Sequence, residues 1–466
     1  MLTSRSLVVI VAISVSLAVL VVLTGSTAAQ TVSVVHTFTG NGDAAYPGSV
    51  TLAQGRDGNL YGTTEGRATT SGEVFRLTAL GTFSGIPVFD GSNASSPLGG
   101  VMLATDGNFY GTTTRGGSAN EGVFFKLTPK GVFSTIHEFT GSGDGAFPEA
   151  PPIEGSDGNL YGTTGGSSTA GSTIYRYDRA ANFTTLLQLQ QDQGTSVITP
   201  LVQGTDGNLY GVASQGGATS CGSVFKMTTQ GALLFLRSFP CGAAGSSPNG
   251  PLIQATDGNF YGTAASGGTA VNQYGIVFRL SQNGVVSRMY SFQGPPSDGA
   301  TPLAGLLQAT DGGLYGVTDV GGAFSSGTLF RISTSGAYTE LHSFTQDEQF
   351  SQVASLMQYT DGTLYGTSTK GGANAFGTVY SVGLGLGSFI TFVLPSGKVG
   401  QSAQILSQGL TGTSSVTFNG VSATNFTVAS DTYMTAVVPG GATTGNVVVT
   451  TPGGTLTSNV SFRIIQ

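Results

Sequence analysis

Tryptophan is absent from this 466-residue sequence, which also has only two cysteines and three histidines. Charged residues are scarce: 17 are basic and 24 are acidic, so the net charge is −7, and no basic run occurs. This balance excludes nucleic acid and anionic membrane surfaces as the main partner. Apolar residues nevertheless make up 39% of the chain, which excludes a disordered protein. Glycine is abundant at 74 residues and, with many Val, Thr, Phe and Tyr, predicts short strands joined by tight turns.

One segment occurs seven times in closely similar form. A representative copy, residues 257–263, reads Asp-Gly-Asn-Phe-Tyr-Gly-Thr, and the steps between copies are 49, 51, 49, 51, 54 and 50 residues. A period near 50 residues is typical of a repeat architecture. The copies begin at Asp57, Asp106, Asp157, Asp206, Asp257, Asp311 and Asp361.

Each repeat is predicted to form four short antiparallel strands. In the fifth repeat the apolar segments span 251–255, 260–263, 276–280 and 286–292. Asp-Gly between the first two segments indicates a type I′ hairpin, in which both central residues have positive φ. The second turn, as at Thr128-Pro129-Lys130-Gly131, indicates a bulged hairpin with glycine in the left-handed position.

Four strands in each of seven repeats predict an all-β fold, a seven-bladed β-propeller over residues 31–382. The region begins with a lone fourth strand, Val32–Phe38, and ends on a third strand, Gly377–Val382. We therefore expect the N-terminal strand to complete the last blade, which closes the ring and removes an open edge.

The two ends of the chain lack the repeat. Residues 1–29 are typical of an export signal, with Arg5 before a long apolar run and a small-residue cleavage site. The length of that run leaves an uncleaved membrane anchor as the alternative. Residues 383–387 are predicted to be a linker, and the alternating pattern of 388–466 predicts an immunoglobulin-like sandwich.

Two families are recognisable in these motifs. The Asp-Gly-Asn-Leu-Tyr-Gly-Thr-Thr, Gly-Gly and Gly-x-Val-Phe-Arg-Leu-Thr motifs of 31–382 resemble the bacterial GloVer tandem-repeat proteins, which implies an exported propeller without an activity to carry over. The tail resembles an IPT/TIG domain at 395–397, 416–421, 438–439 and 451–454. That resemblance implies a spacer or interaction module. Lys398 and Arg463 are its only basic residues, so DNA binding is not expected.

Cys221 and Cys241 flank one predicted hairpin that turns near Gln230. Positions in such a hairpin face each other when their numbers sum to about 460, and these two sum to 462. We therefore predict a structural disulfide, which an exported protein would retain. The pair lacks Cys-x-x-Cys spacing, so a redox-active role is not expected.

Several repeated polar residues are better interpreted as structural. A site is usually unique, so the seven Asp-Gly pairs indicate turns rather than metal loops. The three histidines occupy the same place in the fourth strands of three repeats, which prevents them from converging on a metal or a substrate. Third-strand cations near the turn aspartates indicate ion pairs, with a ring-shaped anion site as the alternative. The histidines are His36, His137 and His342, and the cations are Arg76, Lys126, Arg176, Lys226, Arg279 and Arg331.

The long, variable loops all fall on one face of the predicted ring, opposite the tight turns. Binding sites concentrate in such loops on rigid scaffolds, so we expect any ligand there. Candidate ligand-binding residues are Asp43, Asp144, Asp298 and Asp347, in the loops after the fourth strands. Calcium or a polar ligand is one reading of these acids, and a simple turn role is the other. No other cofactor, metal or catalytic residue is predicted.

We expect a non-catalytic exported module that is extracellular, on the cell surface or periplasmic. Its partner would be a polysaccharide or a protein surface, and it would contact a membrane only if the first segment is not cleaved. The alternative is a secreted carbohydrate-active hydrolase or lyase that uses loop-face carboxylates. Acids gathered around a deep loop-face pocket would favour the enzyme, and scattered acids on a shallow face would favour binding.

Overall fold

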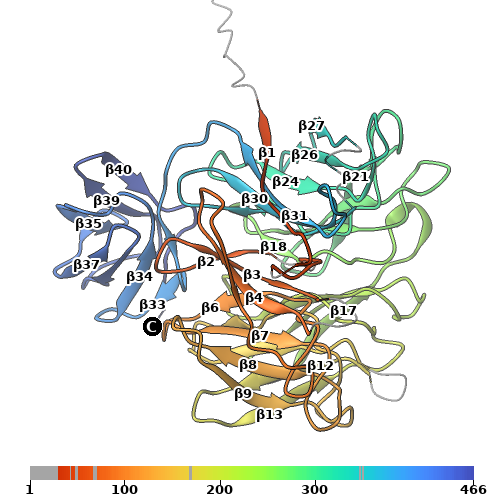
Figure 1. Ribbon diagram of the computed structural model, residues 1–466, viewed down its shortest axis with the longest axis horizontal. Helices are drawn as coiled ribbons and strands as arrows, with labels where there is room; N and C mark the ends of the chain where they lie inside the picture. Colours follow the sequence, from red (N-terminus) through yellow and green to blue (C-terminus); the bar gives the residue numbers. More distant parts are fainter. Residues whose placement is uncertain are drawn as a thin grey trace, which may run out of the picture.

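The computed structural model describes residues 30–41, 43–47, 51–66, 71–166, 171–345, 348 and 351–465, without the side chains of 351–353. This part of the chain is all-β, and its single helix is the short 3-10 segment η1 (Gly242–Ala244). Four-stranded antiparallel sheets surround a centre, and a smaller group of strands packs on one side of them (Figure 1). No helix in the described ranges is long and apolar enough to cross a membrane. The predicted export signal, 1–29, lies outside them.

Each repeat forms an antiparallel sheet whose strands pair in chain order. The second and third strands are almost wholly buried, whereas the fourth is only half-buried, so the sheets are most exposed at the fourth strand. The first six sheets are β2–β5 (Ala53–Gln54, Leu60–Thr64, Glu73–Leu77, Phe83–Ile86), β6–β9 (Val101–Leu103, Phe109–Thr113, Val123–Leu127, Phe133–Glu138), β10–β13 (Ile153–Glu154, Leu160–Thr163, Thr173–Tyr177, Phe183–Gln188), β14–β17 (Val202–Gln203, Leu209–Ala213, Ser223–Met227, Leu233–Ser238), β18–β21 (Ile253–Gln254, Phe260–Ala264, Ile276–Leu280, Val286–Ser291) and β23, β24, β26, β27 (Leu307–Gln308, Leu314–Val317, Thr328–Ile332, Tyr338–Ser343). A small pair, β22 (Gly299–Ala300) and β25 (Val320–Gly321), accompanies the sixth.

The last repeat sheet combines strands from both ends of the repeat region. It contains β28 (Ser351–Val353), β29 (Met357–Gln358), β30 (Leu364–Lys370) and β31 (Thr378–Gly383). The N-terminal strand β1 (Thr31–Thr37) pairs antiparallel with β31, and Val32 lies opposite Val382. The first described strand of the chain therefore occupies the fourth-strand place of the last repeat.

The turn between the first and second strands differs from the predicted type I′ hairpin. In the first repeat Gly58 N donates to Gly55 O, Gly55 N donates to Asn59 O, and only Gly58 of the turn has positive φ. This is a bulged hairpin of the kind predicted for the second turn, where Gly131 N donates to Thr128 O. The type I′ assignment was wrong because Asp57 accepts a hydrogen bond from Asn59 N, and that local turn requires no positive φ at the aspartate.

The residues after the repeats form two four-stranded sheets over one core. One sheet has the order β32 (Thr391–Phe392), β34 (Ser402–Leu406), β38 (Tyr433–Val437), β37 (Phe426–Ser430), and the other β36 (Val421–Ser422), β35 (Ser415–Phe418), β39 (Val447–Thr451), β40 (Gly454–Thr457). Ile405 and Met434 of the first sheet share a buried cluster with Val416 and Val449 of the second. A parallel pair, β33 (Ser396–Gly397) and β41 (Arg463–Ile464), completes this part.

This C-terminal part is docked on the tight-turn face of the repeat sheets. Gln404 Oε1 accepts a hydrogen bond from Arg56 at 2.6 Å, and Gln408 Nε2 donates to Tyr359 Oη at 2.8 Å. Arg463 donates to Thr205 O, in the fourth repeat, at 2.8 Å. The predicted linker is not free either, because Leu384 and Leu386 pack against the buried core of the last repeats. The long-loop face is therefore the open one.

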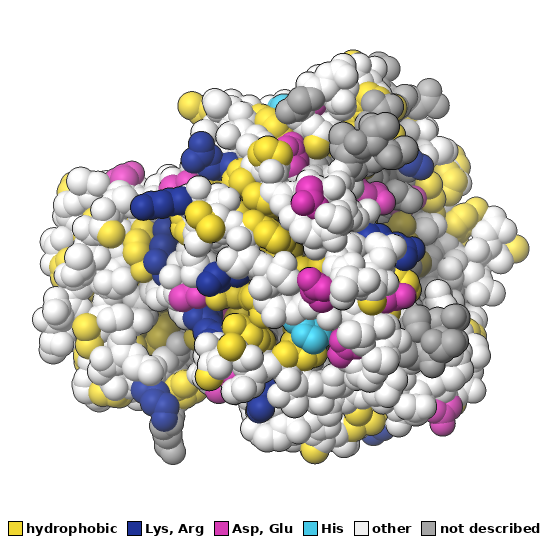
Figure 2. Space-filling view, turned by 60° about the horizontal axis from the view of Figure 1, so that its bottom comes forward, with side chains coloured by type: hydrophobic (Ala, Val, Ile, Leu, Met, Phe, Trp, Pro, Cys, Tyr) yellow, Lys and Arg dark blue, Asp and Glu magenta, His cyan; other side chains and the backbone are white. Residues whose placement is uncertain are grey.

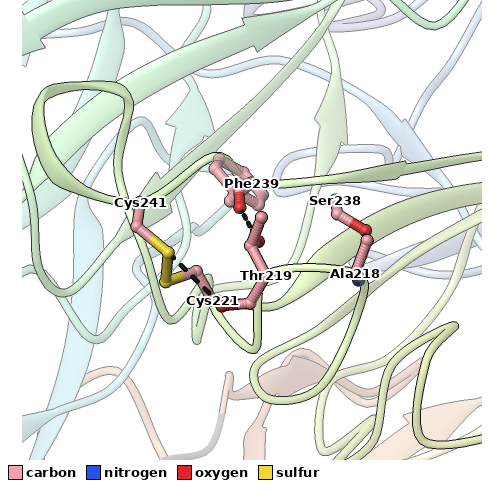
Figure 3. The surroundings of a disulfide bond; sticks show 6 residues. All are labelled: Ala218, Thr219, Cys221, Ser238, Phe239 and Cys241. Carbon is pink, nitrogen blue, oxygen red and sulfur yellow. Dashed lines mark hydrogen bonds between the residues drawn. A yellow bond between two sulfur atoms is a disulfide. The ribbon is translucent and has the colours of Figure 1, made fainter.

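Cys221 and Cys241 form a disulfide, as the hairpin arithmetic predicted. It joins the segment just before β16 to the segment just after β17, next to the hydrogen bond that Thr219 donates to Phe239 O (Figure 3). Ala218 N donates to Ser238 Oγ at 2.9 Å in the same loop. The bond therefore fixes a long loop against the outer strand of its own sheet.

Candidate functional site: the loop-face cavity

An open cavity of about 650 Å³ lies where the long loops of the first four repeats meet. Its walls come from connections between second and third strands and from segments leading into first strands. We call it the loop-face cavity. Its charged and aromatic lining residues are Glu65, Arg115, Phe147 and Glu149, and its amides and hydroxyls include Gln191, Gln215, Ser96 and Thr114.

Two glutamates line this cavity from different repeats. Glu65 directly follows β3, and Glu149 lies in the segment that leads into β10. Burial raises the pKa of both carboxyl groups, and the nearby charge of Glu65 raises the pKa of Glu149 further. Between described residues, neither side chain makes a hydrogen bond or an ion pair. Both carboxyl groups are thus free to accept hydrogen bonds from a ligand.

Arg115 supplies the positive charge of the loop-face cavity. Its guanidinium carbon lies 4.6 Å from the centroid of the Phe147 ring, a cation–π distance. Its backbone is fixed by a two-way pairing with Ser95, at 2.9 and 3.1 Å. Within the described residues no carboxylate forms an ion pair with Arg115. The guanidinium is therefore positioned by a ring rather than neutralised by an acid.

A second, narrower cavity runs along the centre of the repeat region. Its volume is about 260 Å³, and its lining takes residues that lead into the first strand of every repeat. Leu98 and Glu149 line both cavities, so the two adjoin. The other repeats contribute Thr51, Thr199, Pro251, Ala304 and Ser355, among others.

The predicted ligand-binding aspartates lie elsewhere. Asp43 accepts hydrogen bonds from Thr39 at 2.7 and 3.0 Å, and Asp144 does the same with Thr140 N at 3.0 Å. Asp298 is 3% exposed and accepts from Tyr290 and Tyr338 at 2.8 and 2.7 Å. None of the three lines the loop-face cavity, and Asp347 lies outside the described residues.

These contacts show the aspartates in the turn role that the sequence offered as one reading, and ligand binding by them stays a prediction. In the described ranges no group of three or more His, Cys, Asp or Glu side chains is placed to hold a metal ion. Calcium binding therefore also stays a prediction. Figure 2 shows acidic and basic side chains interspersed with neutral surface, without a large patch of one sign.

The histidines lie in three different sheets, as predicted. Each faces an acid of the loop that follows its own strand: His36 with Asp43 at 3.5 Å, and His137 with Asp144 at 3.0 Å. His342 pairs with Glu348 at 3.1 Å. The His137 ring also stacks on Phe183 of the next repeat, with centroids 3.7 Å apart. These rings join outer strands, and they do not meet at one site.

The repeated Asp-Gly motif closes its own turn. In the fifth repeat Tyr261 Oη donates to Asp257 at 2.6 Å, and five further repeats have the same contact. Of the six third-strand cations predicted to form ion pairs, two do so among the described residues, Lys226 with Asp206 at 2.8 Å and Arg331 with Asp311 at 3.2 Å. The motif is therefore structural.

Sequence reasoning missed the four charged and aromatic residues that line the loop-face cavity. For Glu149 a signal was present in the repeat alignment, eight residues before the turn aspartate. Glu149 occupies a place that Leu98, Ile198 and Leu303 fill in other repeats, whereas the place of Glu65 is also acidic in the sixth repeat, at Asp319. An acid that replaces an apolar residue at one position of a repeat is a departure that the fold does not require.

Comparison with known proteins supports the repeat and the fold. The family model described as Gloeobacter/Verrucomicrobia repeat matches residues 21–172, 143–312 and 199–434. No curated protein matches. Virginiamycin B lyase from Staphylococcus aureus is similar in structure, with TM-score 0.52 and 13% identity over 76% of this chain and 99% of that one.

Its catalytically inactive variant with quinupristin gives TM-score 0.51 and 15% identity, with the same coverage. The extracellular domain of a one-component system protein from B. thetaiotaomicron gives TM-score 0.49 and 11% identity, over 92% of this chain and 58% of that one. At these identities the likeness of the lyase structures shows a propeller-like fold alone.

Proposed function

This chain belongs to the Gloeobacter/Verrucomicrobia repeat family, and on that premise we propose that residues 31–382 form a seven-bladed propeller closed by β1. The pairing of β1 with β31 and a central cavity lined from every repeat support the proposal. We assign residues 388–466 to an immunoglobulin-like IPT/TIG module, supported by two sheets over one core.

The protein acts outside the cytoplasm as a binding module whose ligand, a polysaccharide, occupies the loop-face cavity. The observation that carries this proposal is the cavity itself: about 650 Å³, open, and lined by carboxyls, amides and hydroxyls. Such groups accept and donate hydrogen bonds to a ligand rich in hydroxyls. The disulfide is consistent with export, because disulfides persist in oxidising compartments.

Binding is tested with the purified protein on a panel of insoluble polysaccharides and cell-wall fractions, with and without calcium. We expect retention on at least one of them, and at least a tenfold loss of affinity in Glu65→Gln and Glu149→Gln. Glu340→Gln on β27 is the matched control, since Glu340 lies outside the cavity. Absence of retention on every polysaccharide, or equal loss in the control, would reject the proposal.

A second candidate is a glycan hydrolase or lyase, and one observation favours it. Two carboxyl groups with raised pKa share the loop-face cavity, and such pairs serve as general acid and base in glycan cleavage. The same panel decides between the candidates when released sugar ends are assayed. Turnover that Glu149→Gln abolishes would make the protein an enzyme, whereas retention without turnover keeps the binding function.

A further inference from the structure

The loop-face cavity is lined by one positive charge, that of Arg115, and a neutral glycan has no negative group to pair with it. Arg115 faces into a space whose other charged groups are Glu65 and Glu149. A guanidinium without an acidic partner is a donor fork that fits a carboxylate in a bidentate arrangement. The cation–π contact with Phe147 restricts the guanidinium before a ligand arrives, so less side-chain freedom is lost on binding.

The glutamates and the arginine offer different chemistry to one ligand. Glu65 and Glu149 have no hydrogen-bond donor among the described residues, and they suit the hydroxyls of a sugar ring. Arg115 has no acceptor acid there and suits a negative group. A ligand that satisfies all three carries several hydroxyls and one carboxylate.

We propose that the ligand of the loop-face cavity is an acidic glycan, in which Arg115 binds the carboxylate of a uronic acid residue while Glu65 and Glu149 accept hydrogen bonds from ring hydroxyls. This inference rests on the proposed glycan-binding function and names its substrate class. The net charge of −7 makes non-specific attraction to a polyanion weak, so binding of an acidic glycan requires a local cation.

The test compares two ligands with the same sugar backbone. A galacturonic acid oligomer and its methyl ester differ only in the carboxylate, and calorimetric titration gives an affinity for each. We expect the acid form to bind at least tenfold more tightly, with a preference that weakens as salt rises. In Arg115→Gln the ratio of the two affinities falls to about one, and in Arg115→Lys it is only partly restored because ammonium lacks the fork.

Arg237→Gln is the matched control. Arg237 also lies over a phenylalanine, Phe235, at 5.4 Å, but on β17 outside the cavity, and the substitution removes the same charge. The control should keep the full preference for the acid form. An equal loss in both variants would overturn the inference in favour of a general charge effect.

The remaining outcomes separate this inference from the function on which it rests. Equal binding of acid and ester that still depends on Glu149 would overturn the acidic class and leave glycan binding intact. Tighter binding of a glucosamine oligomer than of the acid form would overturn it in favour of a cationic sugar held by the two glutamates. If the acid, the ester, the glucosamine oligomer and the polysaccharide panel are all unbound, both proposals fail.

Discussion

Gln54 donates a hydrogen bond from Nε2 to Thr360 Oγ1 at 2.9 Å, across 306 positions of sequence. The same place in other repeats makes the same kind of contact to the preceding repeat, as when Gln254 Oε1 accepts from Thr205 N at 2.8 Å. The contact that elsewhere joins two consecutive repeats therefore also joins the first repeat, through Gln54, to the last repeat, through Thr360. In the second repeat Leu103 occupies this place, and Arg56 reaches Thr105 O instead.

Replacing Gln54 by alanine should weaken this contact between the first and last repeats. Gln54 is 7% exposed, and its loss leaves the buried Thr360 N without the acceptor Gln54 Oε1, so we expect the free energy of unfolding to fall by about 1–2 kcal/mol. Urea unfolding of the two proteins measures the difference. Gln230→Ala, in an exposed turn, should change it by less than about 0.5 kcal/mol. Equal effects would remove the special role of Gln54.

The disulfide should contribute stability that reductant removes. Cys221 and Cys241 are separated by 20 residues, and closing a loop of this size stabilises by about 3 kcal/mol in the chain-entropy model. We expect the double variant Cys221→Ser, Cys241→Ser to unfold at lower urea, with a midpoint unaffected by dithiothreitol. If dithiothreitol reduces the disulfide, as shown by detection of free thiols, but leaves the urea midpoint of the wild-type protein unchanged, the expected stabilisation is contradicted.

Removing a tyrosine hydroxyl should affect the free energy of unfolding differently at two positions, Tyr261 in the fifth repeat and Tyr175 in the third. Tyr261→Phe removes the bond to Asp257 and should lower the free energy of unfolding by about 1 kcal/mol. Tyr175 is buried, and its hydroxyl has no partner among the described residues. Tyr175→Phe should leave stability unchanged or raise it by up to about 1 kcal/mol, since the other repeats place Phe75 or Phe125 there. Denaturation of both variants provides the comparison, and a larger loss in Tyr175→Phe would refute it.

Glu73 should make stability depend on pH near neutrality. It is 7% exposed on β4, and burial, with a smaller contribution from Asp43, raises its pKa to about 7 from an ordinary 4.5. The folded protein binds this proton more tightly than the unfolded chain does, so the free energy of unfolding falls as pH rises from about 4.5 to about 7 and levels off above.

We expect the free energy of unfolding to fall by on the order of 2 kcal/mol. This is less than the free energy equivalent to the whole pKa shift of Glu73, because solvent screens part of the carboxyl group. Glu73→Gln lacks the titration. We expect the difference in unfolding free energy between variant and wild type to grow over this pH range, measured by urea unfolding at pH 5, 6, 7 and 8. A constant difference would show that Glu73 ionises normally in the folded protein.

The repeat pattern predicted the scaffold because period and turn chemistry recur, so each copy reinforces the last. The third strand of the fifth repeat, Ile276–Leu280, was predicted residue for residue. The cavity was not predicted, because Glu65, Arg115 and Glu149 belong to no repeated motif and are brought together by three different loops. The aspartates singled out in their place recur because the loop needs them, as Thr39 and Asp43 show.

The docked C-terminal part also makes the copies of the turn motif unequal. A methyl group on Gly58 would come within 2.6 Å of Thr432 Cγ2, and Thr432 Oγ1 donates to Arg56 O across 376 positions. The same addition at Gly158 or Gly207 would meet nothing within 4 Å. Substitutions at the first turn are thus limited by its contact with the C-terminal part as well as by its own hairpin. In related chains, the turns that vary least in sequence should be those that contact a second domain.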